Sequence, residues 1–413
     1  MRRLFAVSVV VYLASAPALR AQGLRDQLTD LFTFGTCGKP LCLDLGNGHG
    51  NHFLPAVAAG QTSIIGFVTE AVAQSASSIP ISATSSGATY SIVDGLPVRT
   101  STSAGPIFGE RPQTLGKGRF FIGTNVSAIH YTTLNGAPID DLQFAFAHEN
   151  VGDSARGEPI FENDIIRMNM ALDVNVVQAS LFATWGILDF IDLGVAVPVV
   201  RVSVRGTSTA QIDPFGPNPV LRASSSVDAS STGIGDVVGR LKINLGQGSR
   251  LGAAILGEVR FSTGDAANLL GSGASSGRAL AAIGAKFGAL SVHANGGYLL
   301  RTGDLQNDAI LGTLGFDNQM TPWATLAFSL VSQWQVGDSK LTLPPEIALD
   351  TPFVRRFAAT SIPVRRDDRL EASIGAKFNV RGGTVLVLNG ILPIKRASLQ
   401  PDFVWTAGFE FSF

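Results

Sequence analysis

Two cysteines and two nearby histidines are the first residues with metal-binding or redox potential. Cys37 and Cys42 are the only cysteines and stand in the order Cys-Gly-Lys-Pro-Leu-Cys. In an oxidising compartment such a pair closes a short disulfide loop. His49 and His52 follow closely, but the second half of a zinc-finger framework is missing. We therefore predict a Cys37–Cys42 disulfide and no metal site.

A second group has the residue types of a lipid hydrolase. Ser291, His293 and Asn295 fall on one face of an expected strand. Residues two apart on a strand lie about 6.6 Å apart, too far for a hydrogen bond between nucleophile and base. A polar row facing a lumen is the favoured interpretation, with a membrane-embedded hydrolase as an alternative.

Two Thr-Gly-Asp phrases, ending at Asp265 and Asp304, form a weak repeat. Asp beside Gly is ordinary turn chemistry, and a full set of calcium ligands is missing around either residue. The sequence contains no phosphate loop or nucleotide fingerprint, so we predict no cofactor. A net charge of -1 gives no indication of a nucleic-acid partner.

The first residues predict export. Met1-Arg2-Arg3 is basic, Leu4 to Ala16 is apolar, and small residues follow up to Ala21. This order is typical of a secretory signal peptide, and its apolar stretch is shorter than the roughly 20 residues that a spanning helix needs. We expect residues 1–21 to be removed.

The composition indicates a membrane protein without spanning helices. Charged residues make up 15% of the chain, against roughly 25% in ordinary soluble proteins. Outside the expected signal peptide, no apolar run reaches helix-spanning length. The apolar residues must therefore follow another pattern.

That pattern is clearest in the last twelve residues, 402–413. Apolar and aromatic residues alternate with polar ones, which gives the strand one apolar face. Phe409, Phe411 and Phe413 end the row, and it resembles the terminal strand that the outer-membrane barrel assembly machinery recognises. We therefore expect this machinery to be a partner.

The same alternation recurs upstream, with short connections alternating with long ones. Apolar faces toward lipid, polar faces toward a lumen, and short periplasmic turns against long external loops are typical of outer-membrane barrels. The fold class is therefore all-β, a transmembrane antiparallel up-and-down β-barrel of about 14 strands within a range of roughly 12 to 16. The charged residues expected to line the lumen are Arg240, Lys242, Glu258, Arg260, Glu371, Lys377 and Glu410.

Three regions leave alternatives open. Residues 22–87 do not alternate and form either a plug in the lumen or a periplasmic helical segment, ahead of a barrel over 88–413. The alternation changes phase near Val177 and near Pro198, which predicts β-bulges that serve as a kink or as a lateral opening. The long segment Asp338–Asp368 either folds inward or faces lipopolysaccharide phosphates.

Several phrases resemble a family of outer-membrane transporters associated with the degradation of phenol and other aromatic compounds. They are Thr84–Tyr90, Ser103-Ala-Gly-Pro-Ile-Phe-Gly-Glu-Arg111 with Thr114–Arg119, Gly235-Asp-Val-Val238 and Thr263–Gly273. The family is distantly similar to long-chain fatty acid and hydrocarbon transporters. The resemblance implies a passive barrel transporter with an N-terminal plug and no identified substrate-binding residue.

The leading expectation is thus an outer-membrane channel or passive transporter, not an enzyme, for small molecules in contact with lipid and lipopolysaccharide. An apolar, aromatic solute fits the resemblance, whereas a charged lumen fits a hydrophilic one. A structural or adhesive barrel with a filled lumen is the remaining alternative.

Overall fold

The structure is a computed structural model. It describes residues 22–34, 41, 66–68, 70–72, 75, 90–93, 96–99, 104–147, 165–213, 221–248, 250–304, 306–340, 342–343, 345–349, 354–381 and 383–412. The signal peptide at 1–21, the Cys37–Cys42 disulfide and Phe413 lie outside the described residues. Among the described helices, none is both long and apolar enough to cross a bilayer.

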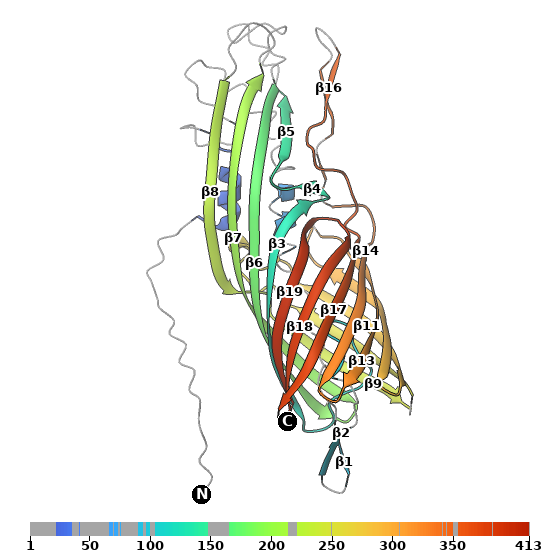
Figure 1. The fold of residues 1–413 in the computed structure, drawn as a ribbon. Helices are drawn as coiled ribbons and strands as arrows, with labels where there is room; N and C mark the ends of the chain where they lie inside the picture. Colours follow the sequence, from blue (N-terminus) through green and yellow to red (C-terminus); the bar gives the residue numbers. More distant parts are fainter. Residues whose placement is uncertain are drawn as a thin grey trace, which may run out of the picture.

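Within the described residues, twelve antiparallel strands form a closed ring. Figure 1 shows this barrel from the side. The last strand pairs with the first, for example at Ala407↔Val126, which closes the barrel. In chain order the ring strands are β3 (Phe120–Leu134), β6 (Ile165–Leu188), β7 (Ile191–Asp213), β9 (Val238–Gln247), β10 (Leu251–Arg260), β11 (Ser276–Phe287), β12 (Leu290–Arg301), β13 (Ala309–Thr321), β14 (Ala324–Gln335), β17 (Arg369–Arg381), β18 (Thr384–Lys395) and β19 (Leu399–Ser412).

The ring confirms the predicted fold class and lies at the lower end of the predicted range of strand number. The choice of about 14 strands counted two segments that do not join the ring. Residues 138–148 contain β5 (Leu142–Ala147), which pairs only with the upper part of β6, and residues 88–110 contain a separate hairpin of β1 (Tyr90–Val93) and β2 (Leu96–Arg99). Local alternation predicts a strand but not its partner.

Three further strands of the same sheet lie outside the ring and lengthen its wall on one side. β8 (Leu221–Ile234) pairs with the upper half of β7, β5 pairs with β6, and the short β4 (Ala137–Pro138) pairs with β3. Figure 1 shows β5 to β8 rising well beyond the closed ring. One of the long connections expected from the alternation, 207–231, is instead mostly strand, because it continues β7 or belongs to β8.

The ring strands carry apolar side chains outside and polar side chains inside. On β19, Trp405 is 68% exposed, whereas Glu410 on the opposite face is 2% exposed. Phe409 and Phe411 point outward with Trp405. An apolar exterior around a polar interior is the arrangement of a transmembrane barrel in the outer membrane.

The change of phase in β6 and β7 is not a bulge, so that prediction was wrong. Even-numbered side chains of β6 face inward along the whole strand, and its register with β7 is continuous from Ile165↔Asp213 to Gly186↔Asp192. The environment changes instead, at about the Val177↔Arg201 row. Below it the outer face is apolar; above it the outer face is polar and the inner face apolar. The strands are longer than the hydrocarbon layer is thick, and the change of phase marks where they leave it. The change of phase is therefore no evidence for a kink or a lateral opening.

An apolar core fills the space inside the raised wall. Helix α1 (Leu24–Asp30) packs on β8, and its Leu24 and Leu28 are buried together with wall residues such as Val202. The helical residues 66–68 and 70–72 contribute Phe67, Val68, Ala71 and Val72 to the same core. The described residues of the 22–87 segment therefore pack against the raised wall.

The segment after β14 returns partly to this core. β15 (Ile347–Leu349) and β16 (Arg355–Phe357) form a hairpin that stands away from the ring in Figure 1. Ser361 then donates its N–H to the Gln143 carbonyl, and Ile362 is buried in the apolar core. At the end of the segment, burial raises the pKa of Asp368, but hydrogen bonds from Lys395 and the Gln335 N–H, with the Lys395 charge, hold it below its ordinary value.

Candidate functional site

Residues 104–115, called the internal segment below, run through the interior of the ring. At one end the Ala104 N–H donates to Thr325 Oγ1 on β14 at 3.1 Å. At the other end the Leu115 N–H donates to the Asp192 carboxylate on β7 at 3.0 and 3.1 Å. The segment thus connects opposite parts of the wall and occupies the lumen between them.

The backbone of the internal segment forms no regular strand, and side chains of the wall satisfy its polar groups. Asn295 on β12 pairs with Glu110 in both directions, with its Oδ1 at 2.8 Å from the Glu110 N–H and its Nδ2 at 2.9 Å from the Glu110 carbonyl. Asn244 on β9 donates to the Pro112 carbonyl at 2.7 Å. Buried backbone groups need such partners, so these amides dock the segment.

Two buried ion pairs tie the same segment to different strands. Glu110 lies 2.6 Å from Lys242 Nζ on β9, and Arg111 forms a two-point pair with Asp317 on β13. The Lys242 side chain is 1% exposed and that of Asp317 is 0% exposed. Removing one partner of such a pair is strongly destabilising, because the other charge is left buried without compensation.

Close glycine contacts allow the segment to approach the wall. An added Cβ on Gly109 would overlap the His293 ring, and one on Gly315 would lie 2.5 Å from His293 Nε2. His293 is therefore enclosed between the internal segment and the strand beside it. Similarly, a Cβ on Gly375 would lie 2.5 Å from Ile107 Cδ1. These glycines are required by close packing rather than by backbone conformation.

The geometry does not assemble the hydrolase considered as an alternative. Asn295 is occupied by the Glu110 backbone, and His293 is buried with neither ring nitrogen hydrogen-bonded within the described part of the chain. The cross-strand neighbours of His293 are Gly284 and Gly315, so neither adjacent strand supplies a nucleophile at this register. Ser291, His293 and Asn295 do not form a nucleophile–base pair.

Most of the charged residues expected in the lumen are found in ion pairs. Glu258 Oε2 accepts from Arg240 Nε at 2.6 Å and from Arg278 Nη2 at 2.7 Å. Lys377 Nζ lies 3.0 Å from Glu410 Oε1, and both side chains are buried. With Lys242 held by Glu110 of the internal segment, these four cations share three carboxylates, so most of this charge is compensated.

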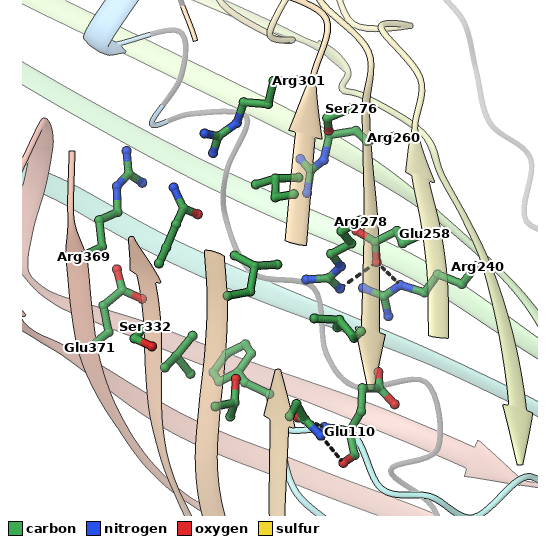
Figure 2. Close-up of a pocket in the computed structure, with 18 of the residues that line it drawn as sticks. Glu110, Arg240, Glu258, Arg260, Ser276, Arg278, Arg301, Ser332, Arg369 and Glu371 are labelled. Atoms are coloured by element: carbon green, nitrogen blue, oxygen red, sulfur yellow. Dashed lines mark hydrogen bonds and ion pairs between the residues drawn. The ribbon is translucent and has the colours of Figure 1, made fainter. Parts of the chain in front are cut away.

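Arg260 and Glu371, the other two expected residues, line a cavity of about 200 Å³ inside the ring. Phe108 and Glu110 of the internal segment form part of its lining. Figure 2 shows arginine and glutamate side chains around the cavity from β9, β10, β11, β12 and β17. Serine, threonine, asparagine and glutamine side chains also line the cavity. The apolar side chains of the lining are Phe108, Leu280, Leu299, Leu311 and Val331.

Sequence reasoning missed the internal segment because it lacks periodicity. Glu110, Arg111 and Asp317, the partner of Arg111, were not among the expected lumen residues. A signal was present, since the segment coincides with the Ser103–Arg111 phrase that carries the family resemblance. Two other such phrases also meet in space: Asp236 accepts from the N–H groups of Gly264 and Ser272 and so ties the loop after β10 to the wall.

The described residues do not form a site for a metal ion. In the described residues, no group of three metal-ligating side chains is close enough to hold an ion. Asp265 accepts from the N–H groups of Ala267 and Asn268 and caps the short helix η3 (Ala266–Asn268). This confirms its role in turn chemistry.

Comparison with known proteins finds similar solved structures but no matching family model and no curated protein that matches. An outer-membrane channel from Pseudomonas putida is 13% identical with a TM-score of 0.41, over 73% of this chain and 97% of that one. CymD, a monoaromatic hydrocarbon channel, is 10% identical with a TM-score of 0.34, over 73% and 91%. The outer-membrane protease OmpT from Escherichia coli is 8% identical with a TM-score of 0.26, over 71% and 97%. The role of a residue does not follow from such similarities.

Proposed function

We propose that the protein is a passive outer-membrane channel for small, weakly polar molecules of about the size of one aromatic ring, and that it is not an enzyme. The observation that carries the proposal is a closed barrel whose lumen contains both a docked internal segment and a cavity of about 200 Å³. A cavity of roughly 150 Å³ accommodates benzene. The lumen is therefore suited to one small solute at a time.

The solute class follows from the cavity lining and from the paired charges. Lys242, Glu258 and Lys377 are each compensated by a partner within 3.0 Å, so much of the lumen charge is internally balanced. Leucine, valine and phenylalanine side chains contribute an apolar surface to the cavity. A weakly polar aromatic compound can bury its ring against these apolar side chains, whereas a sugar has no comparable apolar surface to bury. Among the similar structures, CymD is a channel for monoaromatic hydrocarbons.

The internal segment acts in this proposal as the constriction that solutes must pass. Its docking depends on the Arg111–Asp317 and Glu110–Lys242 pairs, which lie across the lumen. Local displacement of the segment would open a path between the cavity and the periplasmic side. The barrel itself need not change for this to happen.

Uptake into liposomes tests the proposal. Full-length protein should accelerate uptake of benzyl alcohol more than uptake of a small sugar, whereas Asp317→Asn should raise sugar flux by loosening the segment. Asp402→Asn is the matched control, because Asp402 forms an exposed pair with Arg396 on the surface. Uptake of neither solute by either protein would refute the channel and favour a structural barrel with a filled lumen.

Assembly and partners form a second part of the proposal. We propose that β19 is recognised by the barrel assembly machinery through its outward aromatic row, which includes Phe409 and Phe411. Phe409→Ser with Phe411→Ser should lower the amount of folded barrel in the outer membrane. Thr406→Ser, an inward change on the same strand, is the control; equal folding of both variants would refute recognition through this row.

A further inference from the structure

We propose that the luminal cavity binds a small organic monocarboxylate, with the carboxylate at Arg278 and the apolar body against the leucines beside it. The inference rests on the proposed channel and extends its range of solutes, because it adds an anionic carboxylate to the weakly polar molecules proposed above. It depends on three features of the cavity: an excess of positive charge, an arginine with an unused donor, and an adjacent apolar wall.

The charge excess comes from the lining residues. Five arginines and three glutamates line the cavity, which gives a net charge of +2. Two further residues pair with lining residues from outside it: Lys242 with Glu110, and Asp367 with Arg369. They carry opposite charges, but Asp236 and Asp308 also act on Arg260 and Arg301 from outside the lining, so the excess belongs to the lining residues alone. In a confined space of low polarity, this excess favours an anion over a cation.

Arg278 provides a specific donor within that field. One of its terminal nitrogens binds Glu258 at 2.7 Å, but its Nε is buried and makes no hydrogen bond within the described part of the chain. Its side chain is 29% exposed, whereas that of Arg240, which binds the same glutamate, is 4% exposed. A guanidinium group can bind a carboxylate through two parallel N–H donors. The buried Nε is closed to a ligand, so the donor capacity toward the cavity lies with the second terminal nitrogen, which Glu258 does not use.

The other arginines reinforce the preference without supplying the same contact. Figure 2 shows Arg260, Arg301 and Arg369 around the same space as Arg278, from β10, β12 and β17. Arg301 donates to the Asn307 carbonyl, and Arg369 pairs with Asp367 at 3.0 Å. Glu371 faces the cavity from the β17 side and opposes a second negative charge there. A monoanion bound on the Arg278 side is therefore preferred to a dianion that spans the cavity.

Apolar side chains lie where the rest of the ligand would extend. Leu280 follows Arg278 by two residues on β11 and faces the same side, and Leu299 is the cross-strand partner of Arg278 on β12. Phe108 of the internal segment lines the same cavity. A planar ring against these residues and a carboxylate at Arg278 together match a space of about 200 Å³. Benzoate has this shape and is the probe for the test.

Calorimetric titration of the detergent-solubilised full-length protein tests the site. At neutral pH, benzoate should bind saturably, whereas benzyl alcohol, which has the ring without the charge, should bind much more weakly. Arg278→Gln should weaken benzoate binding by about 10- to 100-fold, the loss expected for a charge-assisted hydrogen bond. Arg201→Gln is the matched control, because Arg201 is exposed on the outer face of β7, and it should leave benzoate binding unchanged.

Each other result would overturn a defined part of the inference. Equal binding of benzyl alcohol and benzoate would mean that the ring alone is recognised. Inorganic phosphate that displaces benzoate at the same concentration would mean a general anion site. An Arg278→Gln barrel that folds and binds benzoate normally would refute the role of this residue. Benzoate binding without solute flux in liposomes would refute the channel but support the binding site. Solute flux without benzoate binding would refute the binding site but support the channel.

Discussion

Replacing Gly109 by alanine should displace the internal segment from the barrel wall. An alanine Cβ at this position would overlap the His293 ring. The ring cannot simply move away, because it is 4% exposed and a Cβ on Gly315 would also lie only 2.5 Å from its Nε2. The added methyl group must therefore push the segment into the lumen or strain β12.

The expected magnitude follows from the cost of overpacking. Adding a methylene-sized group to a well-packed site costs about 1 to 3 kcal/mol. If this cost falls on the docked segment, the ratio of displaced to docked molecules rises by about 5- to 150-fold. If it falls on the barrel, unfolding becomes easier by the same free energy. A second substitution, His293→Ala, removes the ring and should cancel most of the effect.

Planar-bilayer conductance and thermal unfolding measure the two outcomes together. Gly109→Ala should show larger or more frequent conducting states than the unaltered protein, and Gly109→Ala with His293→Ala should return toward the conductance of His293→Ala alone. Gly296→Ala is the matched control. Gly296 lies on β12 as His293 does, and an added Cβ there meets no atom within 4 Å.

Two results would refute this reasoning. Gly109→Ala with unchanged conductance and unchanged thermal stability would mean that the segment does not pack on His293. An effect of Gly109→Ala that persists fully in the His293→Ala background would mean that another contact is responsible. The same conclusion would follow if the free-energy changes of the two substitutions simply add, because substitutions of residues in contact should be coupled.

Three further predictions test the wall and its loops. Lys377→Met should destabilise the barrel in denaturant by about 3 to 5 kcal/mol because Glu410 is left buried without a partner, and adding Glu410→Leu should restore much of the loss; a small effect of the single change would refute burial of the pair. Leu181→Lys on the lipid face of β6 should cost about 2 to 4 kcal/mol of folding in lipid vesicles, whereas Asn169→Lys, outward on the same strand but above the apolar belt, should cost little; equal costs would contradict the change of environment along β6. Hydrogen bonds and nearby cations hold the pKa of Asp368 below its ordinary value of 3.8 despite burial, so its stabilisation is present above the unfolded pKa and is lost as the pH falls through the folded one. Pepsin should therefore cleave the preceding loop faster as the pH falls below about 4. The Asp368→Asn variant should be cleaved quickly without this additional dependence of the cleavage rate on pH. A cleavage rate of the unaltered protein that does not change with pH would refute the role of Asp368 in holding the loop.

Alternation along single strands determined the fold class and the inner and outer faces. The terminal strand illustrates this, because Trp405 and Phe409 were assigned to lipid and Glu410 to the interior from period two alone. Such assignments need only local geometry, since neighbouring side chains on a strand always point to opposite faces. The same reasoning placed Lys242, Glu258 and Lys377 on inward faces before their partners were known.

Only the tertiary structure decided which strands close the ring and what fills it. β5 alternates like a ring strand, but the only ring strand with which it pairs is β6, at 165–170. The apparent bulge in β6 is a change of surroundings along an uninterrupted strand. The internal segment has no period to detect, because its backbone is satisfied by side chains such as Asn295, which is distant in sequence. Ion pairs such as Arg111–Asp317 join residues about two hundred positions apart, and their existence depends on barrel closure and register. Sequence pattern therefore gave the faces of the wall, whereas the contents of the lumen required contacts between strands that are remote along the chain.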